Sequence, residues 1–330
     1  MDEGWIRDRI EQVTGRPAPR RLVVTGDTTQ FMSISRGHVL TLGGRHYYIE
    51  GEMREGRFGL DDDPKYWVKK SLELETGERK VLKLVFHEEF KIRIGLLAIR
   101  CRRDAVKEAD VLAGVRGDER FMQGTTVPDD RGNPVRIIEF IRGKSLYRLL
   151  RDLSLDHRIY FETRFPEFLA KLTGCIQAIA ELHARGLHHG DIRTDHVFVE
   201  RDTERFRWID FDLCQDVSDF DVWSLGNVLL YTVGMGEHTF HDVSKGRNGL
   251  RIDGGRLSEN DASAFFSHRV INLRKIFPYI PEDLNDVLMH FSYGTEDFYE
   301  SVNEILADLR PVARRLTAAA ESHSEASLGQ

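Results

Sequence analysis

The feature that most constrains this chain is a polar stretch from His189 to His196, followed fourteen residues later (210 − 196) by Asp210. The stretch holds the carboxylate of Asp191 and the cation of Arg193, and the residues between it and Asp210 have the pattern of a short hairpin. One carboxylate can handle an attacking hydroxyl, the cation can face phosphates, and the second carboxylate can hold a metal. The residue types and their order therefore suit the transfer of a phosphoryl group from a nucleotide.

Length, charge and cysteine content narrow the class of protein. The 330 residues suffice for one large domain or for two lobes that share a cleft. The net charge of −7 disfavours nucleic acid and anionic membrane as partners, and we interpret the basic run at 100–103 as a solvated helix end. Three cysteines without CxxC spacing favour a reducing cytoplasm. The polar N-terminus does not resemble a signal peptide, and no apolar run reaches the roughly 18–20 residues of a membrane span.

Hydrophobic patterns divide the chain into a strand-rich first part and a helical second part. Hairpins are predicted to turn at 43–44 and at 76–78, and a helix is predicted over about 101–115. After a strand at 136–141, helical periodicity dominates, as in 165–186. We therefore expect an α+β chain with an N-terminal extension at 1–45, a small lobe at 46–140, a helical lobe at 141–317 and a disordered tail at 318–330.

This order of elements resembles the protein-kinase-like superfamily over about residues 47–310. The resemblance implies a bilobal fold with an antiparallel β-rich N-lobe, a mainly helical C-lobe and ATP bound between them. It also implies that Lys83 contacts the α and β phosphates and is held by an ion pair to Glu108. Glu108 is favoured over Asp104 and Asp110 because a leucine follows it four residues later, as in the family.

The same resemblance assigns roles in the second half of the chain. Asp191 would orient the attacking hydroxyl or accept its proton, and Arg193 stands where the family has a lysine that faces the γ-phosphate. Asp210 would bind Mg²⁺ or Mn²⁺. His196 replaces an asparagine that binds the second metal in the family. It could be an unusual metal ligand, a phosphate contact or a sign of weakened catalysis.

Two further segments match the family by position. Glu139 and Ile141 lie where backbone groups of the hinge take the adenine edge, although an ordinary edge strand is the alternative. Asp221 begins an apolar helix whose aspartate, in the family, bonds the backbone of the catalytic loop. We expect Asp221 to support that loop and not to catalyse, because a buried carboxylate needs partners.

The glycine-rich loop departs from the family. Gly56 and Gly59 are kept as cofactor-binding candidates, but Arg54 stands where the first glycine is expected. The next expected strand is delayed by residues 60–67, which include three aspartates. Because three carboxylates would repel a triphosphate, we interpret 60–67 as an insertion that loops outward and not as an acidic metal site.

The catalytic region also departs from regulated protein kinases. Gly190 replaces the arginine that clamps a phosphorylated segment, and Asp212 replaces a glycine in the metal-binding triplet, where aspartate tolerates positive φ less easily. Only eleven residues (221 − 210) separate Asp210 from Asp221, and Tyr299 lies near the place of another expected arginine. Aminoglycoside phosphotransferases and other atypical kinases are similar in these respects. Activation gated by phosphorylation is therefore not expected.

The leading hypothesis is an ATP-dependent phosphotransferase, similar to atypical Ser/Thr protein kinases, that phosphorylates a hydroxyl of a protein or of a small molecule. A pseudokinase, which binds a nucleotide or a partner without turnover, is the alternative that the residues at Arg54, His196 and Asp212 support. Adenylyl transfer is a third hypothesis to which no residue specifically points. The sequence does not specify the acceptor, the oligomeric state or the role of the N-terminal extension.

Overall fold

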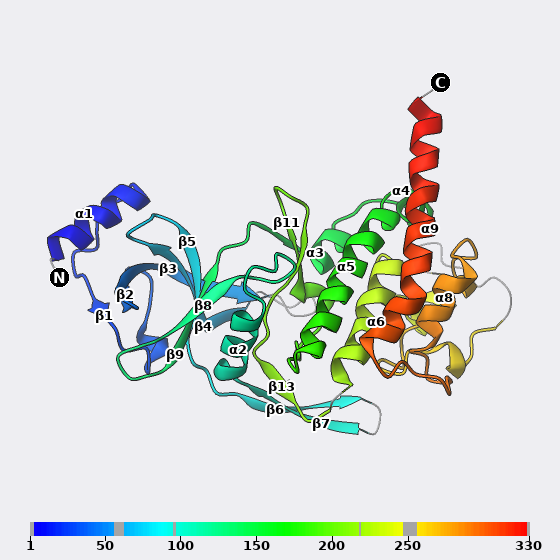
Figure 1. Cartoon of the computed structure of the whole chain (residues 1–330), viewed down its shortest axis with the longest axis horizontal. Helices are drawn as coiled ribbons and strands as arrows, with labels where there is room; N and C mark the ends of the chain where they lie inside the picture. The colour runs from blue at the N-terminus through cyan, green and yellow to red at the C-terminus, as the bar shows by residue number, and fades with distance from the viewer. Residues whose placement is uncertain (1–2, 56–62, 95–96, 218, 247–255, 329–330) are drawn as a thin grey trace. The chain divides into compact units, whose positions relative to one another are not determined.

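The structure is a computed structural model that describes residues 3–55, 63–94, 97–217, 219–246 and 256–328 (Figure 1). Its contacts divide the chain into two units. The strand-rich unit comprises residues 1–88 and 103–141, and the helical unit comprises residues 89–102 and 142–330. The α+β class expected from the sequence is confirmed. Residues 89–102, inside the small lobe that the sequence predicted, group with the helical unit.

A seven-stranded sheet with the order β1-β2-β3-β4-β5-β9-β8 forms the strand-rich unit. All neighbours in it are antiparallel except β1 and β2. The predicted hairpin turns are present, and the first uses Gly43 and Gly44 at φ 56° and 78°, which glycine adopts readily. The strands are β1 Val24–Thr25, β2 Val39–Leu42, β3 Arg45–Glu55, β4 Asp63–Glu73, β5 Arg79–Lys83, β8 Gly124–Pro128 and β9 Pro134–Glu139.

The N-terminal extension is packed onto this sheet. Helix α1 (Glu3–Thr14) buries Ile6 and Ile10 in a cluster with residues of β2 and the end of the β4 hairpin. After the short 3₁₀-helix η1 (Phe31–Ser33) comes β2. The buried carboxylate of Asp129 accepts hydrogen bonds from the Thr28 amide at 2.8 Å and hydroxyl at 2.6 Å. Residues of the segment 3–45 therefore contribute to the core of the unit.

The sequence analysis predicted that residues 60–67 loop outward, and this prediction is wrong for residues 63–67. Those residues lie in β4, where Asp63 pairs with Glu55 and Lys65 pairs with Met53. The delayed strand signal reflects a longer hairpin, because β3 and β4 are both eleven residues long. Residues 60–62 lie outside the described residues, as do Gly56 and Gly59.

The helix predicted over 101–115 begins later, at Ala105, and ends at Gly114 (α2). Asp104 caps it by accepting hydrogen bonds from the amides of Val106 and Lys107, both at 3.0 Å. The basic run at 100–103, interpreted as a helix end, lies instead in strand β7 (Leu97–Arg103). Its residues alternate between buried and exposed, which is the period of a strand.

Strand β7 forms a hairpin with β6 (Glu89–Ile94) that the sequence analysis did not predict. The hairpin belongs to the helical unit, where β7 pairs with β13 (Leu213–Gln215) in the order β13-β7-β6. Its inner face packs into a cluster that contains Ile99, Cys101, Leu213 and Phe220. The segment after Asp210 is thus fixed as the third strand of this sheet.

Helices dominate the rest of the helical unit. Helix α6 is buried on nearly every side, as its apolar sequence predicted, and α5 packs along α9 (Figure 1). None of the helices in the described part of the chain is both long and apolar enough to cross a membrane. The helices are α3 Leu146–Arg151, α4 His157–Thr163, α5 Phe165–Ala184, α6 Phe220–Val233, α7 Phe240–Ser244, α8 Glu282–Met289 and α9 Val302–Leu328.

Short elements complete the helical unit. A second three-stranded sheet has the order β10-β11-β12, with β10 at Gly143–Ser145, β11 at Val197–Glu200 and β12 at Phe206–Trp208. The 3₁₀-helices in the described part of this unit are η2 Thr194–His196, η4 Glu259–Asp261 and η5 Leu273–Lys275. The tail predicted as disordered from 318 is instead helical as far as Leu328, because alanines and a glutamate continue α9.

Candidate active site

The strand-rich unit contains a buried ionic triad of Lys83, Glu108 and Arg136. The Lys83 ammonium donates to Glu108 Oε1 at 2.7 Å, and the Arg136 guanidinium donates through Nε to Glu108 Oε2 at 3.0 Å. The three side chains are 7%, 0% and 2% exposed. The predicted Lys83–Glu108 ion pair is therefore present in the structure, and Arg136 is a member of the site that sequence reasoning missed.

The register of the sheet explains why Glu108 takes two cations. Lys83 on β5 lies directly opposite Arg136 on β9, and like charges in this position repel. Glu108, from α2, binds both and removes the repulsion. The three charges sum to one positive charge. An arginine within the buried run Val135–Ile138 was the sequence signal for this triad, because a buried cation requires an acidic partner.

The two hinge candidates differ in their backbone bonding. The Glu139 amide donates to the Gln123 carbonyl at 3.0 Å, and the Glu139 carboxylate accepts from the Gln123 amide at 2.7 Å. Within the described parts of the chain, the half-buried Ile141 makes no hydrogen bond. The Ile141 amide can therefore donate to a ligand, whereas the Glu139 amide is already used.

In the helical unit, Asp191, Arg193, His196 and Asp210 lie in one cluster. Arg193 Nε is 3.5 Å from Asp191 Oδ1, and His196 Nδ1 is 3.6 Å from Asp191 Oδ2. On the other side of the imidazole, Nε2 is 3.6 Å from Asp210 Oδ2. His196 thus stands between the two carboxylates, whose side chains are 15% and 12% exposed.

Hydrogen bonds define the tautomer of His196. Its Nδ1 lies 2.7 Å from the Asp191 carbonyl, which can only accept, so Nδ1 carries the proton. Nε2 then presents a lone pair, which accepts from Arg193 Nη2 at 2.6 Å. A lone pair beside the Asp210 carboxylate is a donor set that fits a divalent metal, and imidazole suits Mn²⁺ better than Mg²⁺. A metal at this position would displace Arg193 from the lone pair.

The backbone at Asp210 is strained, with φ at 69° in the left-handed region. The sequence analysis placed the demand for positive φ at Asp212, where the family has glycine. Asp212 lies outside that region and is buried. Aspartate is among the few residues that enter the left-handed region at modest cost. The strain therefore falls on the residue whose carboxylate is predicted to bind a metal.

The catalytic loop is anchored by Asp221 at the start of α6. Its carboxylate accepts the amides of His189 and Gly190, both at 2.8 Å, and His183 Nε2 lies 3.0 Å from it. This is the support that the sequence analysis expected of Asp221. His183, His188 and Asp221 each offer a potential metal-ligand atom, and these atoms lie within 4.8 Å of one another. Both carboxylate oxygens of Asp221, however, already accept hydrogen bonds from the loop amides.

A second anchor is the imidazole of His189, which is fully buried. Its ring meets Phe211 edge-on at 5.0 Å between centroids and Trp208 at 5.2 Å. Phe211 follows Asp210 directly, so this contact couples the loop that holds Asp191 to the segment that holds Asp210. Gly190, between His189 and Asp191, has a φ of 84°, which explains a glycine where many kinases have arginine.

Comparison with known proteins points to the same region. Residues 150–228 match the model of the lipopolysaccharide kinase (Kdo/WaaP) family, which is 79 of the 330 residues (228 − 150 + 1). The matched stretch contains Asp191, His196 and Asp210. The chain is an atypical protein-kinase-like phosphotransferase. No curated protein matches it. Kinases of this kind generally use ATP, a divalent metal and a hydroxyl acceptor.

The site residues of this kinase therefore fall into two groups. Lys83 and Glu108 lie together in the strand-rich unit, and the sequence-predicted residues of the catalytic loop lie together with Asp210 in the helical unit. The assignment of each residue to a step in catalysis stays a prediction.

Proposed function

We propose that this kinase transfers the γ-phosphoryl group of ATP to a sugar hydroxyl of a lipopolysaccharide-type acceptor. The observation that carries the proposal is the cluster of Asp191, His196 and Asp210 on a loop anchored by Asp221. The family match covers this cluster and supports a lipopolysaccharide-type acceptor. The short strand β13, in place of a long segment, supports a small acceptor over a docked peptide.

In the proposed reaction, the acceptor oxygen forms a bond to the γ-phosphorus while the bond between that phosphorus and the ADP oxygen breaks. Asp191 orients the hydroxyl and accepts its proton, which later passes to solvent. Lys83 and Arg136, both bound by Glu108, provide positive charge for the nucleotide phosphates, and Arg193 stabilises charge on the transferred group. Ile141 is the proposed backbone donor to the adenine edge.

Asp210 and His196 would hold the divalent metal, which neutralises phosphate charge when it is bound. The imidazole leads us to propose that Mn²⁺ supports turnover better than Mg²⁺. We also propose a cytoplasmic location, because Cys101, Cys175 and Cys214 are all free thiols, as is usual in a reducing compartment.

The proposal is tested with γ-labelled ATP, either metal, and two acceptors: purified lipopolysaccharide and casein. Label should enter lipopolysaccharide with wild-type enzyme and not with Asp191→Asn. Label in casein alone would replace the sugar acceptor with a protein. Nucleotide binding without ADP formation under either metal would favour a pseudokinase, and a protein mass gain of one adenylyl group would favour adenylyl transfer.

A further inference from the structure

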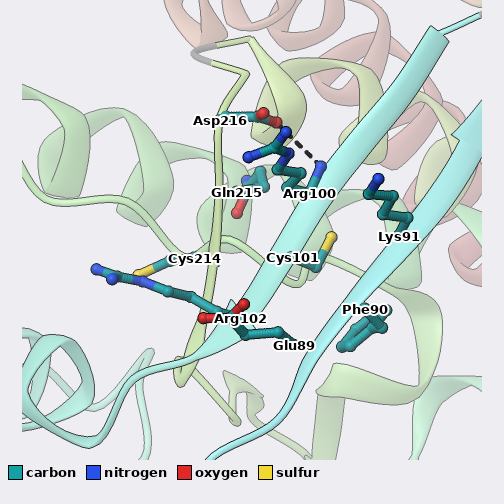
Figure 2. Close-up of a pocket in the computed structure, with 9 residues that line it drawn as sticks. All are labelled: Glu89, Phe90, Lys91, Arg100, Cys101, Arg102, Cys214, Gln215 and Asp216. Atoms are coloured by element: carbon teal, nitrogen blue, oxygen red, sulfur yellow. Dashed lines mark hydrogen bonds between the residues drawn. The ribbon is translucent and has the colours of Figure 1, made fainter.

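The hairpin β6–β7 and the segment 214–216 line a cavity of about 670 Å³ in the helical unit (Figure 2). Three cations, Lys91, Arg100 and Arg102, contribute to its wall, together with the carboxylates of Glu89 and Asp216. This volume lies within the usual range for small-molecule sites. The cavity is therefore large enough for part of an acceptor.

Two cations of this hairpin repel each other when no ligand is bound. Lys91 on β6 lies directly opposite Arg100 on β7, and both side chains are exposed. Like charges directly opposite each other destabilise an antiparallel pair. Among the described residues, neither side chain forms an ion pair. Glu89, in contrast, lies opposite Arg102, where the charges attract.

Protection of a sheet edge does not explain this pair. Charged residues on an outer strand discourage pairing with other chains, and this reason applies to Lys91 because β6 is the outer strand. Arg100 and Arg102, however, lie on β7, which is the central strand of the three. The exposed face carries four cations, with Arg93 as the fourth, against two carboxylates, in a chain with a net charge of −7. A local positive excess of this kind attracts anions.

One wall of the cavity belongs to the segment that follows Asp210. Its wall at 214–216 begins four residues (214 − 210) after Asp210, and the Arg100 amide donates to Asp216 Oδ1 at 3.1 Å. Burial, followed by the negative charges of Asp191 and Asp216, raises the pKa of the Cys101 thiol to about 11. Cys101 also lines the cavity, and its side chain belongs to the buried face of the hairpin, opposite to the exposed face that carries Lys91 and Arg100.

We propose that Lys91 and Arg100 form a docking site for an oxyanion group, carboxylate or phosphate, carried by the acceptor sugar. The inference rests on the proposed function, because it places the acceptor beside Asp191. An oxyanion between the two side chains would convert their repulsion into two charge-assisted hydrogen bonds. The β6–β7 hairpin would then do for a charged sugar what a long activation segment does for a peptide.

Binding in the absence of ATP tests this site apart from turnover. The probe is the anionic core oligosaccharide released from lipopolysaccharide, and a neutral malto-oligosaccharide of similar length is its control. The test variant is Lys91→Gln with Arg100→Gln. The matched variant is Arg310→Gln with Arg314→Gln, which removes two exposed arginines from α9. Titration calorimetry gives the dissociation constant for each protein.

Wild type and the α9 variant should bind the core oligosaccharide equally, and the hairpin variant should bind it about tenfold or more weakly. Failure of the wild type to bind, equal binding by the hairpin variant, or equally tight binding of the neutral probe would overturn the inference. Failure of the proposed function would instead be seen in the assay with labelled ATP, as turnover that is absent or that does not depend on Asp191.

Discussion

The two charged clusters of this kinase differ in the lengths of their ion pairs and in the burial of their side chains. In the strand-rich unit, Glu108 binds Lys83 at 2.7 Å and Arg136 at 3.0 Å, and all three side chains are buried. In the helical unit, Asp191 and Asp210 each lie 3.6 Å from His196 and remain partly exposed. The first cluster therefore contributes to folding. The second is positioned by other residues, and its carboxylates are the groups proposed to meet a substrate and a metal.

Removing the central charge of the first cluster should give the largest effect. Glu108→Gln leaves two buried cations opposite each other without a counter-charge, so the free energy of unfolding should fall by about 3–5 kcal/mol. Asp110→Asn, an exposed position of the same helix, should change it by less than about 0.5 kcal/mol. Urea titration of both variants measures the difference. Equal stability would show that the triad does not support the fold.

Disturbing the support of the second cluster should reduce the rate more than the stability. Asp221→Asn replaces one carboxylate oxygen by an amide donor, which cannot accept the amide of His189 or Gly190. The loop should shift, and kcat should fall about 100-fold. Asp286→Asn on α8 is a matched control. Steady-state kinetics with circular dichroism separates a displaced loop from unfolding, and an unchanged kcat would contradict the anchoring role.

Replacing His196 should change the preference for Mn²⁺ over Mg²⁺, by a smaller factor than the fall in kcat expected for Asp221→Asn. Asparagine offers a hard oxygen in place of the imidazole nitrogen, so His196→Asn should lower the ratio of Mn²⁺-supported to Mg²⁺-supported kcat about tenfold. The measurement is kcat with each metal at saturation. A ratio that does not change would remove His196 from the proposed metal site and favour a phosphate contact instead.

The smallest effect concerns acid stability, and it distinguishes the two units. Burial lowers the pKa of His157 in the helical unit to about 4, while its ring contacts Tyr279 and the Val233 carbonyl. In the strand-rich unit, hydrogen bonds from Thr28 and Asn133 outweigh burial and hold the pKa of Asp129 below its usual range. The unfolded chain binds a proton at His157 below about pH 6.5, whereas the folded chain does not until about pH 4.

The contribution of His157 to the free energy of unfolding of the helical unit is therefore fully present above about pH 6.5, and it is lost as the pH decreases towards 4. The contribution of His157 to the loss between pH 6.5 and 5.5 should be about 1 kcal/mol. The total loss should be smaller in His157→Gln but not absent, because burial also lowers the pKa of His238 in the same unit. Asp129 stabilises the strand-rich unit above its unfolded pKa of about 4, so that unit should not weaken in this window. The stability of each unit is measured by urea unfolding, followed by tryptophan fluorescence in variants that keep only the tryptophans of that unit. Equal losses in both units would contradict the assignment.

Features set by residues close together in the sequence were predictable. The turn at Gly43 and Gly44 needs only local backbone freedom. The contact between Asp221 and the loop around Asp191 followed from the resemblance to the protein-kinase-like superfamily. The Lys83–Glu108 ion pair followed from a family pattern that encodes their spacing.

Features set by distant contacts were not predictable. The basic run at 100–103 forms a strand because β13, more than a hundred residues later, pairs with it. Arg136 joins the triad only because the sheet places β9 beside β5. The positive φ lies at Asp210, not Asp212, directly before Phe211, which packs against His189. Each of these outcomes depends on a tertiary neighbour that sequence periodicity does not identify.

The central claim is that the carboxylate of Asp191 carries phosphoryl transfer. The direct measurement is the rate of ADP formation from ATP, with Mg²⁺ or Mn²⁺ and lipopolysaccharide, by wild type, Asp191→Asn and Asp202→Asn. Asp202 is an exposed turn residue of the same unit. The account predicts a fall of about 10²–10⁴-fold for Asp191→Asn and no change for Asp202→Asn. ADP formation at the wild-type rate by Asp191→Asn would contradict it.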